Sequence, residues 1–176
     1  MYKKAVFTLI ICCGIFSFTR TAEAQKKKID WLSINEVNIK LQENPQPVLI
    51  DLYTDWCYWC KVMDKKTYSN SKVIEYINTH FYAVKLNAET RDSVLWNGKG
   101  FKYDVQNKIN EFSLYVTQGQ LAFPNTVIFP DSKQMPASIP GYIEPQEIEV
   151  ILRYFGDGVY KTKNFNEYSA NFKSTW

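Results

Sequence analysis

The chain is organised around a stretch in which an apolar run leads directly into two cysteines: Asp51-Leu52-Tyr53-Thr54-Asp55-Trp56-Cys57-Tyr58-Trp59-Cys60-Lys61. The apolar residues 48–53 predict a short buried strand, and the residues from Cys57 to about Lys66 predict a helix. A cysteine at a helix N-terminus faces unpaired backbone N–H groups and the positive end of the helix dipole, which favour its thiolate. Cys57 takes that position, and Cys60 follows one turn later on the same side. This spacing predicts a redox-active pair that can close a disulfide.

An acidic and a basic residue are expected close to the cysteines. Asp51 lies inside the apolar strand, on the opposite face from Ile50 and Leu52. A buried carboxylate has a raised pKa and can exchange protons near neutrality, so Asp51 is the candidate base that deprotonates Cys60. Lys85 lies in a second apolar strand and is a natural charge partner for Asp51 if the two strands adjoin. The alternative is that Asp51 and Lys85 form only an ion pair at a strand end.

The first 24 residues predict a secretory signal peptide. Two lysines precede an apolar segment, residues 5–18, that is short for a membrane span, and Ala22-Glu23-Ala24 fits a small-x-small cleavage site. The alternative is an uncleaved membrane anchor. Removal of residues 1–24 takes away two of the four cysteines and leaves Cys57 and Cys60. We therefore expect an exported protein of the periplasm or cell envelope.

The mature chain of 152 residues is long enough to bury a hydrophobic core without disulfide staples. It carries 18 Lys and Arg against 17 Asp and Glu, because the signal segment contains three basic residues and one acidic residue. This balance gives no electrostatic footprint for a nucleic acid or an anionic membrane. We expect one domain over residues 25–156, with an insertion at about 88–111, and a C-terminal extension over 157–176.

The other elements are predicted from hydrophobic periodicity, capping residues and turn residues. Ser33 and Glu36 form a capping-box pattern at a helix start, and Asn97-Gly98 suits a tight hairpin turn. The expected helices are 34–43, 57–66, 71–80, 108–117 and 145–155, and the expected strands are 48–53, 81–87, 126–129 and, at a sheet edge, 137–140. The strand–helix–strand order over 48–87 indicates two parallel strands. Residues 160–176 are either a docked helix or a loose tail.

The chain resembles the thioredoxin superfamily. The resemblance is carried, in this order along the chain, by Asp51–Lys61, Val84-Lys85-Leu86-Asn87, Pro124 before an apolar strand, and Gly141. Residues 31–87 look most like exported bacterial thioredoxin-like proteins and are similar to the C-terminal thioredoxin domain of the membrane disulfide-interchange reductase. The resemblance implies an α/β fold of three α/β/α layers around a central mixed sheet, here with an inserted hairpin.

The resemblance also implies residue roles. Cys57 would be the nucleophile, Cys60 the resolving cysteine, Asp51 the buried acid/base and Pro124 a cis-proline. A cis peptide at this position would expose the backbone of Phe123 to a bound substrate. The aromatic residues beside the cysteines are expected to face the substrate as well: Trp56, Tyr58 and Trp59.

Three departures from the family pattern bear on function. Tyr58-Trp59 replaces the Gly-Pro of ordinary thioredoxins, and because this dipeptide is a main control of the redox potential, the potential does not carry over. Asn125 follows Pro124 where threonine is usual, which leaves the local hydrogen bonding open. The insertion at 88–111 either shapes the choice of partner or is a plain surface hairpin.

Other chemistries fit the cysteines less well. Zinc needs four ligands, and the mature chain adds only His80 to Cys57 and Cys60. Covalent haem attachment needs a histidine after Cys60, where Lys61 stands. We therefore expect no metal and no cofactor.

Two functional classes remain after these exclusions. The first is an exported thiol–disulfide oxidoreductase, with reduction of protein disulfides favoured over oxidation or isomerisation. Its partners would be disulfide-containing exported proteins and a membrane-embedded thiol electron donor. The second is a non-catalytic module that binds a peptide or partner protein in the groove at Pro124.

Overall fold

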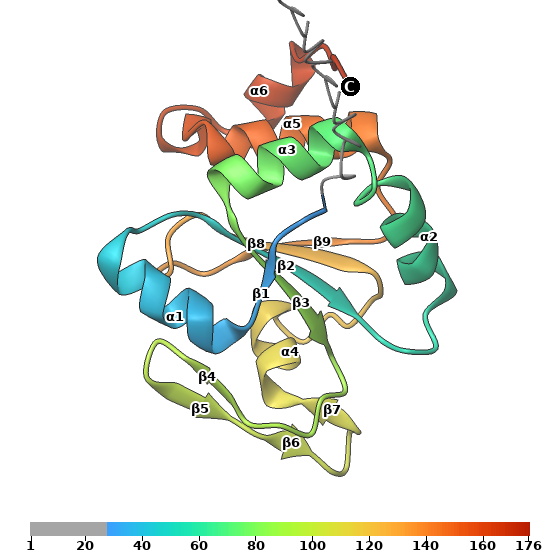
Figure 1. Ribbon diagram of the computed structural model, residues 1–176, viewed down its shortest axis with the longest axis vertical. Coiled ribbons are helices and arrows are strands. Elements are labelled where there is room, and N and C mark those ends of the chain that lie inside the picture. Colours follow the sequence, from blue (N-terminus) through green and yellow to red (C-terminus); the bar gives the residue numbers. More distant parts are fainter. Residues whose placement is uncertain (1–27) are drawn as a thin grey trace, which may run out of the picture.

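A computed structural model describes residues 28–176, so the expected signal peptide, residues 1–24, lies outside the described residues. The centre of the fold is a five-stranded mixed sheet with the strand order β1-β3-β2-β8-β9 (Figure 1). Its strands are β1 (Trp31–Leu32), β2 (Val48–Tyr53), β3 (Tyr82–Asn87), β8 (Asn125–Phe129) and β9 (Ala137–Pro140). The first three strands are parallel to one another, and β8 and β9 run antiparallel to their neighbours. The predicted mixed sheet, with β9 at an edge, is confirmed.

Helices cover both faces of the sheet (Figure 1). They are α1 (Ile34–Glu43), α2 (Tyr58–Lys66), α3 (Ser71–His80), α4 (Glu111–Val116), α5 (Pro145–Gly156), the 3₁₀ helix η1 (Val159–Lys161) and α6 (Phe165–Ala170). One face carries α2, α3 and α5, and the other carries α1, α4 and the inserted strands. The three-layer α/β/α fold is therefore confirmed.

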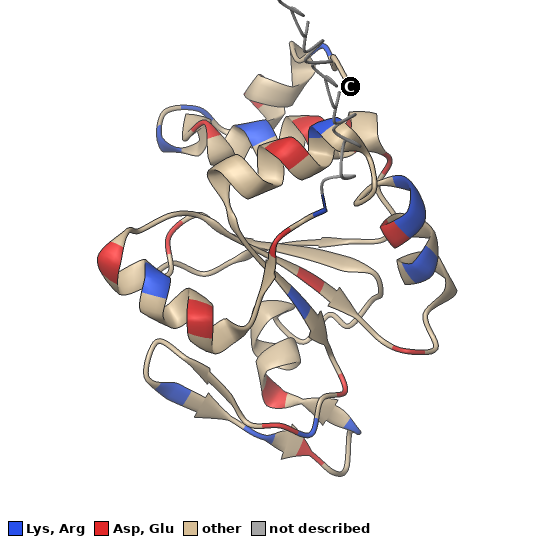
Figure 2. Ribbon diagram, in the orientation of Figure 1, with Lys and Arg blue, Asp and Glu red and all other residues tan. Residues whose placement is uncertain are grey.

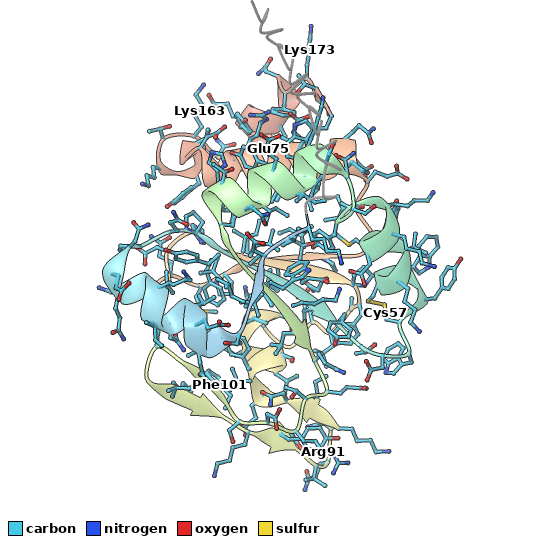
Figure 3. All side chains as sticks on the ribbon, in the orientation of Figure 1. Cys57, Glu75, Arg91, Phe101, Lys163 and Lys173 are labelled. Carbon is cyan, nitrogen blue, oxygen red and sulfur yellow. A yellow bond between two sulfur atoms is a disulfide. The ribbon has the colours of Figure 1, made fainter. Side chains whose placement is uncertain are left out.

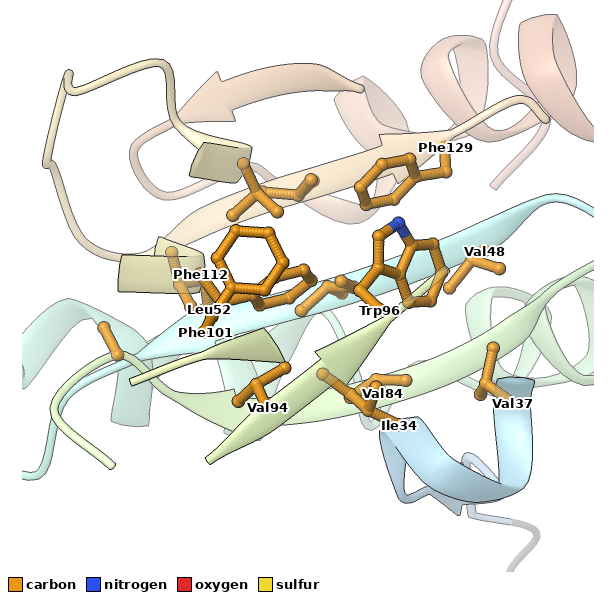
Figure 4. Close-up of a cluster of buried hydrophobic side chains, with 14 of the residues drawn as sticks. Ile34, Val37, Val48, Leu52, Val84, Val94, Trp96, Phe101, Phe112 and Phe129 are labelled. Carbon is orange, nitrogen blue, oxygen red and sulfur yellow. The ribbon is translucent and has the colours of Figure 1, made fainter. Parts of the chain in front are cut away.

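The alternation of side chains along β2 explains how the site is built. Val48, Ile50 and Leu52 point into the core beneath α1 and α4. Figure 4 shows Val48 and Leu52 in this core together with Trp96 and Phe129. Because successive strand residues face opposite sides, Asp51 points to the face that α2 covers. The crossover through α2 and α3 brings β3 back parallel to β2, with Asp51 opposite Lys85. Two residues 34 positions apart thereby become neighbours.

The insertion contains two small hairpins where the sequence predicted one. The expected hairpin is β4 (Val94–Trp96) with β5 (Lys99–Phe101), and its turn places Asn97 and Gly98 at φ values of 49° and 77°. A second hairpin follows, β6 (Tyr103–Asp104) with β7 (Ile109–Asn110).

The helix predicted from position 108 begins later, at Glu111. Lys108 has a φ of 54°, a left-handed turn conformation that is incompatible with a helix. The Asn110 side chain accepts a hydrogen bond from the Phe112 N–H and caps the helix instead. An asparagine two residues inside the expected start was the local signal for this boundary.

The C-terminal extension is docked. The buried carboxylate of Glu149 in α5 accepts hydrogen bonds from the Ser174 hydroxyl, from the backbone and hydroxyl of Thr175, and from the Trp176 backbone. Arg153 pairs with the same carboxylate at 2.8 Å and lies over the ring of Trp176. Of the two alternatives for residues 160–176, a docked segment containing a helix is the correct one.

Candidate active site

The two cysteines lie at the start of α2 and are joined by a disulfide, with their Cα atoms 5.4 Å apart (Figure 3). Cys57 is the N-cap residue, and its Sγ accepts a hydrogen bond of 3.0 Å from the Cys60 N–H. The backbone of Cys57 is anchored in turn, because its N–H donates to the Thr54 carbonyl. Only 4% of each cysteine is exposed. The helix-start position predicted for Cys57 is confirmed, and it presents Sγ to the unpaired N–H groups of the first turn.

Asp51 is buried on the α2 side of the sheet, with 2% of the residue exposed. Its Oδ2 lies 2.7 Å from the Nζ of Lys85. Burial raises the pKa of Asp51 to about 6, and the nearby Lys85 charge only partly offsets that effect. Asp51 can therefore change protonation state near neutrality, which is what a proton acceptor for a thiol requires.

Lys85 is shared between two carboxylates. Its ammonium contacts Asp64 of α2 as well as Asp51, and it lies over the rings of Tyr53 and Trp31, at 5.0 and 5.6 Å from the centroids. Partial burial lowers the pKa of Lys85, but the charges and hydrogen bonds of the two carboxylates outweigh this, and the net shift is upward. Lys85 is therefore held as a cation (the blue segment of β3 in Figure 2).

Two residues of this network were not predicted from the sequence. Asp64 lies four positions after Cys60, a spacing that places both on one side of a helix and could have identified it. Tyr68 is buried, its hydroxyl lies 3.3 Å from Thr126 Oγ1, and burial together with the Asp51 charge raises its pKa well above the usual value. A pocket of about 270 Å³, lined in part by Asp64 and Tyr68, opens beside them.

The loop before β8 forms the other side of the site. The Phe123–Pro124 peptide bond is cis, as the family resemblance implied. The Pro124 carbonyl accepts a hydrogen bond of 2.8 Å from the Gly141 N–H, which joins this loop to the loop after β9. Phe123 is half-buried and packs edge-to-face on Trp56 at 5.9 Å between ring centroids. The structure thus brings Pro124 and the cysteine loop together, although they are more than 60 positions apart.

The aromatic residues flanking the cysteines are exposed. Trp56, Tyr58 and Trp59 have 66%, 69% and 53% of their surface accessible. The Trp56 indole N–H donates to Glu89 at 3.0 Å, and the Trp59 ring lies 5.6 Å from the Tyr142 ring. Large exposed aromatic side chains that cluster at one place are typical of a surface that another molecule covers. Tyr142 had no local signal in the sequence, because only the fold brings it to α2.

Asn125, which departs from the family pattern, is fully buried at the start of β8. Its Oδ1 accepts a hydrogen bond of 3.0 Å from the Ser138 hydroxyl. Its Nδ2 has no hydrogen-bond partner among the described residues. The hydrogen bonding that the sequence left open at this position is therefore half satisfied.

Two structural features are absent from residues 28–176. Within this range there is no group of three or more His, Cys, Asp or Glu side chains placed to hold a metal ion. In the same range no helix has the length and apolar character needed to cross a membrane.

Comparison with protein families gives one match over most of the chain. Residues 19–148 match the family model described as "Thioredox_DsbH: Protein of unknown function, DUF255". The matched range includes the two cysteines, Asp51, Lys85 and Pro124.

Curated relatives include proteins named for disulfide interchange. The chain is 26% identical over 147 residues to "Thiol:disulfide interchange protein DsbD" of Pectobacterium atrosepticum, which covers 80% of this chain and 22% of that protein. It is 23% identical over 164 residues to the protein of the same name from Campylobacter jejuni, covering 83% of this chain and 26% of that protein. The chain thus spans about a quarter of the length of these relatives.

Solved structures confirm the fold. A structure described as "DsbH Oxidoreductase" superposes with a TM-score of 0.54 at 15% identity, covering 80% of this chain and 92% of the other. A thioredoxin-fold protein from Helicobacter pylori superposes with a TM-score of 0.56 at 18% identity, covering 84% of each chain. At these identities the similarity establishes the thioredoxin fold alone.

Proposed function

The chain belongs to the thioredoxin-like family of the Thioredox_DsbH model, and on that premise we propose that it is an exported thiol–disulfide oxidoreductase that reduces protein disulfides. One observation carries the proposal. The Cys57–Cys60 disulfide caps the first turn of α2, on the side of the sheet where the buried Asp51 and its partner Lys85 lie. A purely structural disulfide across so short a loop would add little stability by chain entropy. Stabilisation of the fold therefore does not account for the presence of the two cysteines.

The proposed reaction has two thiol–disulfide exchange steps. In the reduced protein, the Cys57 thiolate attacks one sulfur of the substrate disulfide, forms a mixed disulfide and releases the other substrate sulfur as a thiolate. The Cys60 thiolate then attacks the Cys57 sulfur, which re-forms the Cys57–Cys60 disulfide and releases the second substrate thiolate. Two electrons pass from the protein dithiol to the substrate.

Cys57 and Cys60 become thiolates by different means in these steps. The Cys57 thiolate is stabilised by the N–H groups and dipole of α2, so it is ready to attack. Cys60 lies within the helix and needs a base, and we assign that role to Asp51. A carboxylate with a pKa of about 6 accepts a thiol proton more readily than an ordinary aspartate does. Lys85, held by Asp51 and Asp64, positions the Asp51 carboxylate.

We place the reaction outside the cytoplasm. The N-terminal sequence has the pattern of a secretory signal, and an oxidising compartment is where protein disulfides form and need reduction or repair. Our proposed partners are disulfide-containing exported proteins and a membrane-embedded thiol donor that re-reduces Cys57 and Cys60. The curated relatives' names, which refer to disulfide interchange, support this assignment.

An insulin-reduction assay tests the activity. With dithiothreitol as the electron donor, wild-type protein should accelerate insulin precipitation, and Cys57→Ser should fall to the rate of dithiothreitol alone. Cys60→Ser should trap a mixed disulfide with the substrate, because Cys57 can attack but nothing resolves the adduct. A wild-type rate equal to the background would reject the enzyme and favour the non-catalytic binding module.

The direction of the reaction depends on the redox potential. Reductases such as thioredoxin lie near about −270 mV, and strong oxidants lie near about −120 mV. We assign reduction because the Asp51–Lys85 pair follows the thioredoxin pattern. Equilibration of the protein with glutathione or dithiothreitol buffers measures the potential, and a value at the oxidising end would replace reduction by oxidation or isomerisation.

A further inference from the structure

Two aromatic rings enclose the Lys85 ammonium, and the register of the sheet puts them there. Trp31 of β1 is paired with Ala83, which lies two positions before Lys85 on β3. Tyr53 lies two positions after Asp51, the partner of Lys85, on β2. Because residues two positions apart in a strand face the same side, these side chains all lie on the face that α2 covers. The Lys85 Nζ lies 5.6 Å from the centroid of the Trp31 ring and 5.0 Å from that of Tyr53. These two rings are here called the lysine cage.

Trp31 is fixed in place by its neighbours. Its ring packs edge-to-face on the buried ring of Tyr68, with the centroids 5.4 Å apart. Its backbone belongs to the sheet through the pairing of β1 with β3. Directly before it, the Asp30 N–H donates a hydrogen bond of 3.0 Å to the side chain of Asn78 on α3. The position of the Trp31 ring is therefore set independently of the lysine that lies against it.

Without the cage, the Lys85 ammonium has a better hydrated alternative. Only 3% of the Asp51 side chain is accessible, whereas 42% of the Asp64 side chain is. An ammonium is strongly hydrated, so an unrestrained Lys85 would lean toward Asp64 and solvent rather than toward the buried acid. The face of an aromatic ring attracts a cation and replaces part of the water that the cation has lost. The cage therefore offsets the cost of keeping this charge beside Asp51.

The Trp31 ring also borders solvent. It lines the pocket of about 270 Å³ together with Asp64 and Tyr68. Since the same ring contacts the Lys85 ammonium, a smaller side chain at this position would open the pocket toward the ion pair. Water at that place would weaken the attraction between the ammonium and the Asp51 carboxylate. Trp31 thus acts on the ion pair in two ways, by holding its cation and by excluding water from it.

We propose that Trp31 is a positioning residue of the reaction, because its ring holds the Lys85 ammonium against Asp51, the proposed base. The inference rests on the proposed function and adds to it a residue of the edge strand β1. The charged and titratable groups that act on Asp51 come from β3, from α2 and from the turn after α2, and they are Lys85, Asp64 and Tyr68. Trp31 contacts two of these three groups, Lys85 and Tyr68.

The test measures how strongly Lys85 acts on Asp51 with and without the Trp31 ring. In the oxidised protein, Lys85→Met should raise the pKa of Asp51, which NMR titration of its carboxyl ¹³C shift measures. In a Trp31→Leu background the same substitution should raise that pKa by less, with a difference of about half a unit or more, because the ammonium is no longer held. Trp31→Phe keeps a ring and should keep most of the wild-type rise. Comparing paired variants cancels the direct effect of water entry on Asp51.

Tyr82→Leu is the matched control. Tyr82 lies on the opposite face of β3 and also has a lysine over its ring, with the Lys40 Nζ 5.8 Å from the centroid. Removal of this ring should leave the effect of Lys85→Met on Asp51 unchanged. Replacement of Trp31 by fluorinated tryptophans covers the case in which Trp31→Leu does not fold. Fluorine weakens the attraction of the ring face for a cation and nearly preserves the shape of the ring, so the rise should shrink as fluorine atoms are added.

A kinetic measurement links the ion pair to the reaction. When reduced protein meets dithiobis(nitrobenzoate), Cys57 attacks it and releases one thionitrobenzoate anion. Cys60 then loses its proton to Asp51 and attacks the Cys57 sulfur, which releases the second thionitrobenzoate anion and closes the disulfide. In Trp31→Leu, the pH midpoint of the second release should move in the same direction as the pKa of Asp51 in that variant.

Two results would overturn the positioning role of Trp31. One is an effect of Lys85→Met on the Asp51 pKa that has the same size in wild type, in Trp31→Leu and in the fluorinated proteins. The other is a second release whose pH midpoint stays at the wild-type value in Trp31→Leu. Failure of reduced wild-type protein to reduce dithiobis(nitrobenzoate) would instead overturn the proposed function, while the NMR titration of oxidised protein would still decide whether Trp31 holds Lys85.

Discussion

Lys85 Nζ lies 2.7 Å from the buried Oδ2 of Asp51 and contacts the carboxylate of Asp64 at the same time. One cation thus serves two acids, of which Asp51 is buried and Asp64 is partly open to solvent, with 42% of its side chain accessible. Lys85 therefore stabilises the Asp51 carboxylate less than a cation that contacted no other acid would. Burial remains the dominant influence on its pKa. The protonation of Asp51, and with it the reactivity of Cys60, depends on how Lys85 is shared.

Asp51→Asn should make the oxidised protein more stable at neutral pH. The pKa of Asp51 is about 6 in the folded protein and about 3.9 in an unfolded chain, so the folded state binds more protons between those values. Asp51 therefore favours the folded state most below about pH 4, and about 2–3 kcal/mol of that stability is lost as the pH rises through 6. Urea unfolding of wild type and Asp51→Asn at pH 4 to 7 measures this as the change in their stability difference. A difference that stays constant over that range would contradict the assigned pKa.

Asp64→Asn and Lys85→Met should move the pKa of Asp51 in opposite directions. The Asp64 charge raises that pKa, so its removal should lower the pKa below about 6. The Lys85 charge lowers it, so its removal should raise it. The carboxyl ¹³C shift of Asp51, followed by NMR titration of the oxidised protein, reports both changes. Shifts in the same direction would show that Asp64 does not act through charge on Asp51.

Asn125→Thr should stabilise the protein by about 1 kcal/mol, because it removes a buried amide nitrogen that has no partner among residues 28–176. Ser138→Ala serves as the control. It removes the hydroxyl that donates to Asn125 Oδ1 and should destabilise wild type more than it destabilises the Asn125→Thr variant. Thermal unfolding of the four proteins gives the coupling. A lower melting temperature for Asn125→Thr would indicate that the amide is paired in solution.

Glu149→Gln should release the docked segment and lower the stability by about 2–3 kcal/mol, because Arg153 and four donors of residues 174–176 lose a charged acceptor. Burial raises the pKa of Glu149, but these hydrogen bonds outweigh it and bring the pKa to about 2. The contribution is therefore present above about pH 4 and is lost only as pH falls through 2.

Hydrogen exchange at the Thr175 and Trp176 amides measures the release of the docked segment directly. Both amides should exchange faster in Glu149→Gln. Glu75→Gln, on the exposed side of α3, is the matched control and should leave both amides protected. Unchanged exchange in Glu149→Gln would mean that the segment is held by the packing of Trp176 on Tyr76 instead.

Local pattern was enough for most of the elements and for the centre of the site. The capping box at Ser33 and the alternation along residues 48–53 depend on neighbours a few positions away, and the structure has both. Asp51 alternates with Ile50 and Leu52 along the strand. The strand alone therefore predicted that the Asp51 side chain faces away from the core that those two residues enter. The predicted helix start at Lys108 was wrong, because the cap at Asn110 sets the start at Glu111 although the apolar pattern extends further back.

The sequence by itself determined the cysteine pair at a helix start, the acid inside a buried strand and the family to which they belong. Those features are set by spacing along the chain, because a helix or a strand gives the side chain at each position a fixed direction. Only the tertiary structure decided that Asp64 shares Lys85, that Tyr142 lies on Trp59, and that Glu149 holds residues 174–176. Lys85 and Asp64 are 21 positions apart, and the other two contacts join residues even farther apart. No local period encodes them, because they exist only once the helices pack on the sheet.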